Sequence, residues 1–250
     1  MKNKVVLITG GSRGIGAATA VQAAAAGWDV LLSFHTDQTA AEAVVSQITD
    51  KGRHAMAIQA DMACEEQIRR LFAVADVQFG RLDALVNNAG IVDTAQTVAE
   101  FSLERLERMF RINTIGAFLC AREAVLRMST ARGGHGGAIV NVSSIAARLG
   151  APGQYVDYAA SKGAMDVMTL GLAKEVAAEG IRVNAVRPGL IETDIHASGG
   201  QPDRVQHLAP RVPMRRGGSA LEVANAIVWL MSEESPYTTG SLIEISGGNL

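Results

Sequence analysis

The chain has 250 residues, a formal net charge of −2, 48% hydrophobic residues, 26 glycines and 4% aromatic residues. This length suits one large α/β domain, and scattered charges that nearly cancel exclude a basic nucleic-acid-binding surface. No stretch approaches the roughly 20 apolar residues that span a bilayer, and the N-terminal segment lacks the cleavage site of a signal peptide. We therefore expect a soluble, cytoplasmic protein with neither a membrane nor a nucleic-acid partner.

Short apolar runs alternate with longer helical patterns along the whole chain. The apolar runs predict seven strands, at residues 5–9, 29–34, 54–59, 82–87, 138–143, 181–187 and 241–245, and segments such as 16–26, 39–51 and 65–79 predict helices. This alternation is typical of an α/β protein, here a three-layer αβα Rossmann fold with a seven-stranded parallel sheet. Because no linker or repeat divides the chain, we expect residues 1–250 to form a single domain. The Pro- and Gly-rich segment 188–218 lacks clear periodicity, as lids and specificity loops do.

A glycine-rich segment, TGGSRGIG at residues 9–16, lies between the first expected strand and the first expected helix. Glycines let the backbone turn tightly and approach a pyrophosphate, and the helix start offers free N–H groups to it. The spacing differs from the common G-x-G-x-x-G fingerprint, and the G-K-[ST] ending of a P-loop is missing. We predict a dinucleotide site formed by Gly10, Ser12, Arg13, Gly14, Ile15 and Gly16.

The end of the second expected strand indicates which dinucleotide is bound. An NAD site usually has an acid there for the ribose 2′-hydroxyl, but this strand ends in Ser33-Phe34-His35. Arg13 in the glycine loop is suited to pair with a 2′-phosphate. The sequence therefore favours NADP(H) over NAD(H). Two alternatives stay open: a solvated Arg13, and Asp37 as the acid if the strand extends further.

Two further motifs follow the third and fourth expected strands. Asp61 either accepts a hydrogen bond from an adenine amino group or caps the next helix. Residues 87–90, NNAG, place amides and small residues where a sharp turn would lie beside a ligand. No metal site is expected, because the two cysteines match no metal-ligand spacing and the five histidines are dispersed.

Tyr158 and Lys162 are four residues apart, which places them on one face of a helix. A phenol with a pKa near 10 is a poor base, but a neighbouring cation favours phenolate. The pair thus supplies an acid for ketone reduction and a base for alcohol oxidation. Tyr155 has no such partner, and it either lines the substrate pocket or packs. The G-x-S-x-G elbow of serine nucleophiles is missing.

Hydroxyl and amide side chains accompany this pair. Ser143 and Ser144 end the fifth expected strand, at the sheet edge where α/β proteins bind ligands, so one of them is suited to donate to a substrate oxygen. Which of the two does so stays open. Asn113 is either an anchor for a water or a backbone carbonyl near Lys162, or a structural residue.

Taken together and in order, these motifs resemble the short-chain dehydrogenase/reductase family over essentially the whole chain. The resemblance implies a catalytic tetrad of Asn113, Ser144, Tyr158 and Lys162. In it Tyr158 exchanges the proton, Ser144 orients the substrate oxygen, Lys162 holds the nicotinamide ribose, and Asn113 supports a proton relay. The resemblance also implies cofactor contacts from Tyr158 and Lys162 themselves and from Asp61, Met62, Asn88, Ala89, Gly90, Pro188, Gly189, Ile191 and Thr193.

The expected activity is NADP(H)-dependent interconversion of a secondary alcohol and a ketone or aldehyde. The chain is similar to a bacterial branch described as sugar dehydrogenase-like or 3-oxoacyl carrier-protein reductase-like, which leaves the substrate open. The resemblance further implies a homotetramer built through the long helices and C-terminal strands, with a dimer as the alternative. A competing hypothesis is a catalytically inactive dinucleotide-binding regulatory module on the same fold.

Overall fold

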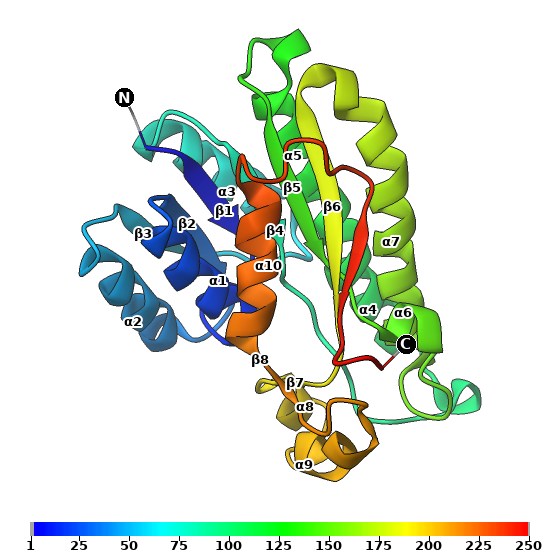
Figure 1. Ribbon diagram of the computed structural model, residues 1–250. Helices are drawn as coiled ribbons and strands as arrows, with labels where there is room; N and C mark the ends of the chain where they lie inside the picture. Colours follow the sequence, from blue (N-terminus) through cyan, green and yellow to red (C-terminus); the bar gives the residue numbers. More distant parts are fainter. Residues whose placement is uncertain (1–2, 250) are drawn as a thin grey trace.

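The computed structural model describes residues 3–249, and its centre is one parallel sheet of seven strands in the order β3-β2-β1-β4-β5-β6-β9 (Figure 1). The strands are β1 (Val5–Ile8), β2 (Asp29–Phe34), β3 (Ala55–Gln59), β4 (Ala84–Asn87), β5 (Gly137–Val142), β6 (Ile181–Pro188) and β9 (Leu242–Ile245). Every predicted strand is present, and its bounds differ from the prediction by at most two residues. The predicted fold is therefore confirmed.

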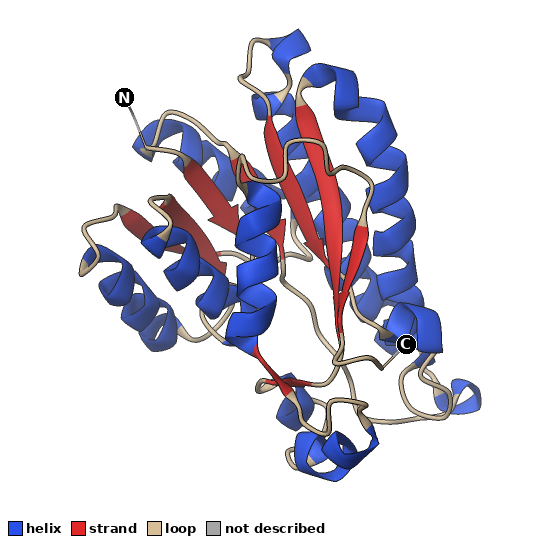
Figure 2. Cartoon of the chain, viewed as in Figure 1, coloured by secondary structure: helices blue, strands red, loops and turns tan. Residues whose placement is uncertain are grey.

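Helices cover both faces of the sheet (Figure 2). The helices are α1 (Gly14–Ala25), α2 (Gln38–Thr49), α3 (Glu65–Gln78), α4 (Leu103–Phe110), α5 (Ala117–Met128), α6 (Ala146–Leu149), α7 (Val156–Val176), α8 (Ile195–Ser198), α9 (Arg204–Leu208) and α10 (Ala220–Met231). A π-helix, η2 (Arg111–Gly116), joins α4 to α5, and short 3-10 turns are η1 (Val98–Glu100), η3 (Thr130–Arg132), η4 (Ala177–Glu179) and η5 (Ala209–Arg211). No helix among the described residues is long and apolar enough to cross a membrane.

The apolar strand runs form the middle of two cores, one on each face of the sheet. In β1, Val6 and Ile8 face a core that includes residues of α1, α2 and α10, while Val5 and Leu7 face a second core with α3, α5 and α7. All four β1 side chains are buried. Because helices cover both sides of these parallel strands, apolar residues occupy consecutive positions in their sequences.

Side-chain caps fix where several helices begin. The Asp37 carboxylate accepts a hydrogen bond from the Ala40 N–H at 2.9 Å and caps α2. Because β2 ends at Phe34, as predicted, Asp37 serves this helix start and does not end the strand. Ser219 and Glu222 form a capping box at the start of α10.

The segment 188–218 carries more structure than its sequence indicates. A two-stranded parallel sheet pairs β7 (Ile191–Glu192) with β8 (Gly218–Ser219) and closes the base of this segment. Between these strands lie α8, α9 and η5, on the side of the sheet toward which the strands run (Figure 1). We call residues 195–211 the lid.

Candidate active site

The glycine loop between β1 and α1 has a backbone that only glycine adopts easily. Gly10 and Gly14 have φ angles of 64° and 54°, in the left-handed region that other residues rarely enter. At Gly16 a Cβ atom would lie 2.2 Å from the Gly10 carbonyl oxygen. The first turn of α1 has no acidic residue and no side-chain cap, so its N–H groups remain free for an anion. This cradle fits the pyrophosphate of a dinucleotide.

Residues after β4 hold the glycine loop in place. Asn88 Nδ2 donates to the carbonyl oxygens of Thr9 and Gly10 at 2.9 and 2.8 Å. In return, Thr9 Oγ1 accepts from the N–H groups of Asn88 and Ala89, each at 3.0 Å. The NNAG motif and the glycine loop are therefore one hydrogen-bonded unit, although 79 residues separate Thr9 from Asn88.

The predicted adenosine end lies at β2 and β3. Ser33 Oγ accepts from the Gly10 N–H at 3.1 Å, so the end of β2 supports the glycine loop. The Arg13 side chain is exposed and has no hydrogen bond or ion pair within residues 3–249. Asp61 Oδ1 accepts from the Ala63 N–H at 2.8 Å in the loop before α3. Since the N-cap of α3 is Cys64, Asp61 does not cap that helix.

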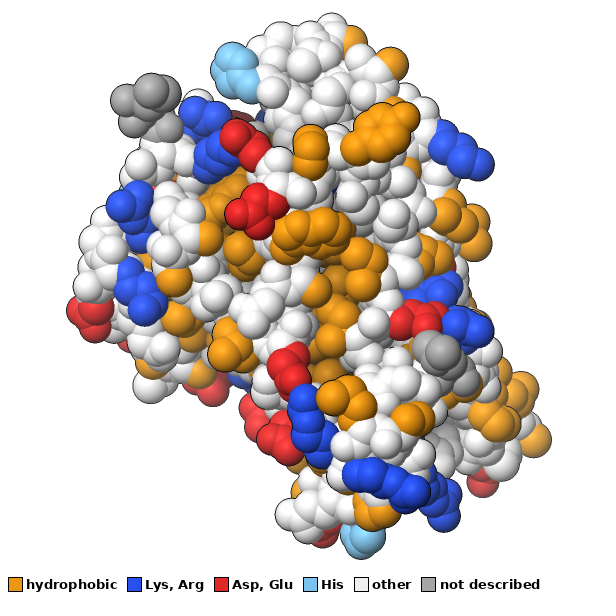
Figure 3. Space-filling model, viewed as in Figure 1, with side chains coloured by type: hydrophobic (Ala, Val, Ile, Leu, Met, Phe, Trp, Pro, Cys, Tyr) orange, Lys and Arg blue, Asp and Glu red, His pale blue; other side chains and the backbone are white. Residues whose placement is uncertain are grey.

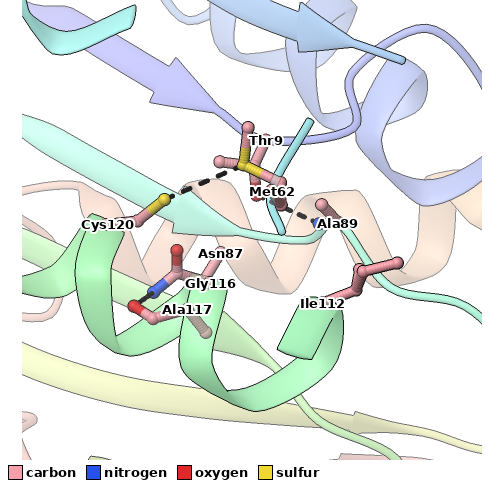
Figure 4. A pocket seen from close by; sticks show the side chains of 8 residues that line it. All are labelled: Thr9, Met62, Asn87, Ala89, Ile112, Gly116, Ala117 and Cys120. Carbon is pink, nitrogen blue, oxygen red and sulfur yellow. Dashed lines mark hydrogen bonds between the residues drawn. The ribbon is translucent and has the colours of Figure 1, made fainter. Parts of the chain in front are cut away.

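A small cavity of about 10 Å³ lies beside the glycine loop (Figure 4); its lining residues are Thr9, Met62, Asn87, Ala89, Ile112, Gly116, Ala117 and Cys120. The Met62 side chain packs inward, with its sulfur 3.9 Å from Cys120 Sγ, which leaves the Met62 backbone for any cofactor contact. Burial raises the pKa of Cys120 to about 12, so this thiol stays protonated and unreactive.

Helix α7 carries both Tyr158 and Lys162 on the side facing β5. Lys162 is buried, and its Nζ donates to the Val142 carbonyl oxygen at 2.7 Å and lies 5.8 Å from the centre of the Tyr158 ring. Burial lowers the pKa of Lys162 to about 8, against the opposing effect of Asp166. Burial raises the pKa of Tyr158, and the Ser144 side chain partly offsets this rise. The two groups predicted for proton transfer therefore lie together.

The two serines after β5 have different partners. Ser143 is buried, and its hydroxyl donates to the Lys162 carbonyl oxygen at 3.2 Å. Ser144 Oγ accepts from the Ala146 N–H at 3.1 Å, and the Ser144 side chain lowers the pKa of Tyr158 against the effect of burial. Of the two serines, Ser144 is thus the one whose side chain affects the pKa of Tyr158.

Asn113 lies in the π-helix η2, a rare geometry that is frequent at functional sites. Its Oδ1 accepts from the Ile91 N–H at 2.8 Å, and its Nδ2 donates to the Ile91 carbonyl oxygen at 2.9 Å. A Cβ at Gly90 would lie 3.3 Å from both Asn113 Oδ1 and Lys162 Nζ. Asn113, Lys162 and the NNAG turn therefore meet at Gly90.

The segment after β6 returns to the glycine loop. Gly189 packs on Ser246 so closely that a Cβ would lie 2.7 Å from the Ser246 Cα, and Ile191 is buried. Thr193 reaches across to Gly14, where a Cβ would lie 3.3 Å from the Thr193 methyl carbon. Pro188 lies beside the segment that follows β5, since its carbonyl oxygen accepts from the Ile145 N–H at 3.0 Å. The predicted residues thus lie along one edge of the sheet. Within residues 3–249, no three His, Cys, Asp or Glu side chains are grouped to hold a metal ion.

Comparison with known proteins agrees with this geometry. The family model described as "Enoyl-(Acyl carrier protein) reductase" matches residues 10–249. A short-chain type dehydrogenase/reductase of Picea abies is 37% identical over 254 residues, which cover 99% of this chain and 92% of that protein. The chain belongs to the short-chain dehydrogenase/reductase family. It is therefore an oxidoreductase, of the class that acts on CH–OH groups with a nicotinamide cofactor, and the predicted resemblance is confirmed.

Similar proteins include two oxidoreductases and one protein whose structure was solved with NADPH. An uncharacterized oxidoreductase of Escherichia coli K12, YgfF, is 54% identical over 244 residues, which cover 98% of this chain and 99% of that protein. Glucose 1-dehydrogenase 2 of Bacillus subtilis is 35% identical and covers 99% and 95%. A blue fluorescent protein from a metagenomic library, solved in complex with NADPH, superimposes with a TM-score of 0.89 at 36% identity and covers 98% and 97%.

One feature of this family member was not predicted from its sequence. Arg105 of α4 and Asp157 of α7 form a buried ion pair, with Nε and Oδ2 2.7 Å apart and side chains that are 6% and 0% exposed. Arg105 Nη1 also donates to the Thr94 carbonyl oxygen at 2.7 Å, and Asp157 Oδ1 accepts from the Tyr158 N–H at 2.9 Å. This pair ties the start of α7, and with it Tyr158, to the loop that follows the NNAG turn.

Proposed function

We propose that this protein is an NADP(H)-dependent oxidoreductase that interconverts a secondary alcohol and a ketone or aldehyde, with Tyr158 as general acid and base. The observation that carries the proposal is the arrangement of Tyr158. The Ser144 side chain lowers the pKa of its phenol, and the buried Lys162 ammonium lies beside its ring. A regulatory module that only binds the dinucleotide has no need of this complete set, so we favour the enzyme over the inactive alternative.

The reaction requires two things of the chain: a polarised substrate oxygen and a proton. A bound nicotinamide supplies or accepts the hydride. Ser144 and Tyr158 hydroxyls bind the carbonyl oxygen, and Tyr158 donates its proton as that oxygen gains negative charge. Because burial raises the pKa of Tyr158, the phenol is protonated at neutral pH, as reduction requires. In alcohol oxidation the phenolate takes the proton back.

Lys162 affects the protonation of Tyr158, and Asn113 positions the turn beside Lys162. The Lys162 ammonium favours the phenolate form of Tyr158 by its charge, and its bond to the Val142 carbonyl oxygen holds it in place. Asn113 fixes the backbone of Ile91 through two hydrogen bonds, which sets the turn at Gly90 against Lys162. We assign the ribose contact to Lys162 and the support of a proton relay to Asn113.

Arg13 and the end of β2 favour NADPH over NADH. Arg13 is exposed beside the phosphate cradle, and no acid ends β2. We expect Arg13→Leu to raise the NADPH Kd about 10- to 100-fold, because a charge-assisted hydrogen bond contributes about 1.5–3 kcal/mol, and to change the NADH Kd less than about threefold. Titration calorimetry measures both, with the exposed Arg132→Leu as a matched control. Equal changes for the two cofactors would contradict the assignment.

A substrate panel tests the function itself. The purified protein is mixed with NADPH or NADH and a set of ketones, aldehydes and ketoses, and loss of the reduced-nicotinamide absorbance is followed. We expect turnover of at least one carbonyl compound, faster with NADPH than with NADH. Tight NADPH binding without turnover of any compound would favour the inactive module.

We also propose that the protein assembles as a homotetramer in the cytoplasm. Leu221, Trp229 and Tyr237 leave an exposed apolar surface on and beyond α10 (Figure 3). A second apolar surface lies on η2, α5 and α7, with Ile115, Phe118, Val167 and Leu170 exposed. Two such surfaces suit the two interfaces of a tetramer with dihedral symmetry. Light scattering coupled to size exclusion should give a mass four times 26.2 kDa; a dimer or monomer would contradict this.

A further inference from the structure

The lid contacts the segment that follows the NNAG turn and the residue that precedes α7. Gly199 packs so closely on the segment after the NNAG turn that a Cβ would lie 3.1 Å from Val92 Cγ1 and 3.3 Å from the Asp93 carbonyl oxygen. Tyr155 Oη donates to the Gly199 carbonyl oxygen at 3.5 Å. Tyr155 precedes Tyr158 by about one helical turn, so these contacts set the lid beside the proposed proton donor.

Arg204 of α9 is the charged residue that joins the lid to the residues directly before α7. Its Nη1 donates to the side-chain oxygens of Gln154 and Gln201 at 2.8 and 2.5 Å. The guanidinium carbon lies 5.3 Å from the centre of the Tyr155 ring. Arg204 therefore has a fixed place, held by two neutral amides and an aromatic face.

The other two nitrogens of this guanidinium have no partner. Within residues 3–249, Arg204 Nε and Nη2 make no hydrogen bond and no carboxylate pairs with the side chain, although it is half-buried. Other covered arginines differ: Arg105 and Arg187 each pair with an aspartate, and Arg182 donates to carbonyl oxygens at the end of α10. Arg204 thus keeps an uncompensated positive charge. We call the side of the guanidinium formed by Nε and Nη2 the open edge.

This open edge has the geometry that recognises anions. The Nε and Nη2 N–H groups of an arginine point in parallel and match two oxygens of a carboxylate or phosphate. The neighbouring His196 links the position to the cofactor end, because its Nε2 lies 2.9 Å from the carbonyl oxygen of Ile191, one of the cofactor contacts that the family resemblance implies. Burial and the charge of Arg204 lower the pKa of His196.

We propose that Arg204 is the anion-binding subsite of the substrate pocket, and that the substrate is a carbonyl or hydroxy compound bearing a carboxylate or phosphate group. The inference rests on the proposed function, since it places the charged group of the same substrate that Tyr158 protonates. The Nε and Nη2 edge binds this group, while Gln154, Gln201 and Tyr155 hold the guanidinium in position.

Matched pairs of probes test the proposal by turnover with NADPH. Acetoacetate is compared with methyl acetoacetate, and dihydroxyacetone phosphate with dihydroxyacetone, so that carboxylate and phosphate are distinguished. We expect at least one anion to have a higher kcat/KM than its neutral partner. Arg204→Gln should lower kcat/KM about 10- to 100-fold for that anion and less than about threefold for the neutral compound. The exposed lid residue Arg211 gives the control variant Arg211→Gln.

A binding measurement separates this proposal from the proposed function. Calorimetry of the NADP⁺ complex with acetoacetate or inorganic phosphate should show an affinity about tenfold or more higher for the native protein than for Arg204→Gln, whether or not turnover occurs. Equal loss of kcat/KM for charged and neutral substrates, or equal anion affinity of the two proteins, would overturn the proposal and leave Arg204 as a lid contact.

Discussion

Tyr158→Phe is expected to lower kcat for carbonyl reduction about 10²- to 10⁴-fold, because the variant has no proton to give to the substrate oxygen. Removing one hydroxyl leaves the glycine cradle untouched, so the NADPH Kd should change less than about threefold. Steady-state rates and cofactor titration measure the two effects. Tyr237→Phe is the matched control: this side chain is fully exposed and lies outside the site, and we expect its rate to stay within a few-fold of native.

The pH dependence of the native rates is a second test of Tyr158 as the proton donor. Because burial raises the pKa of Tyr158 above its ordinary value of 10.0, the phenol stays protonated through neutral pH. Reduction should therefore be flat around neutrality and fall only at alkaline pH, whereas alcohol oxidation should rise with pH. Native activity in the Tyr158→Phe variant would remove this residue from the chemistry.

Arg105→Met should lower the free energy of unfolding by about 3–5 kcal/mol, because it leaves a buried carboxylate without its partner. Asp157 is completely covered and pairs with Arg105 at 2.7 Å. The same change frees the start of α7, so kcat should fall as well, although Arg105 touches no reacting group. Urea unfolding at neutral pH measures the stability change.

Two further variants test whether loss of the buried ion pair causes the lower free energy of unfolding. Arg108→Met breaks an ion pair with Asp93 that is more than half exposed on the arginine side, and exposed pairs contribute about 1 kcal/mol or less. Removing both charges, in Arg105→Met/Asp157→Asn, should recover part of the stability lost in the single variant. A loss of less than about 1 kcal/mol in Arg105→Met would show that the carboxylate is accommodated without its partner.

Local sequence patterns are enough to predict the sheet and its ligand-binding edge. The strand runs are apolar because both faces of the sheet are covered, and motifs that follow parallel strands necessarily meet at one edge. Hence Gly10, Asn88 and Ser144, which follow strands directly, can be assigned to one edge from their positions in the sequence. The choice between Ser143 and Ser144 depends on the fold, since adjacent residues differ only in the direction of their side chains.

Contacts between distant segments carry no comparable signal. Arg105 and Asp157 are 52 residues apart, and single charged residues usually lie on the surface, so nothing in the sequence marks them as partners. The π-helix at Asn113 and the lid contacts of Arg204 likewise depend on which segments meet in space. One available clue is Asp157 itself, an acid directly before the predicted catalytic tyrosine.

The transfer of a labelled hydride tests the central claim most directly. NADPH carrying deuterium at C4 of the nicotinamide, prepared as each of the two stereoisomers, is incubated with the protein and its best carbonyl substrate. We predict that one isomer delivers one deuterium to the carbinol carbon of the product, seen by mass spectrometry and NMR. Product without deuterium from either isomer, or cofactor oxidation without product, would contradict the account.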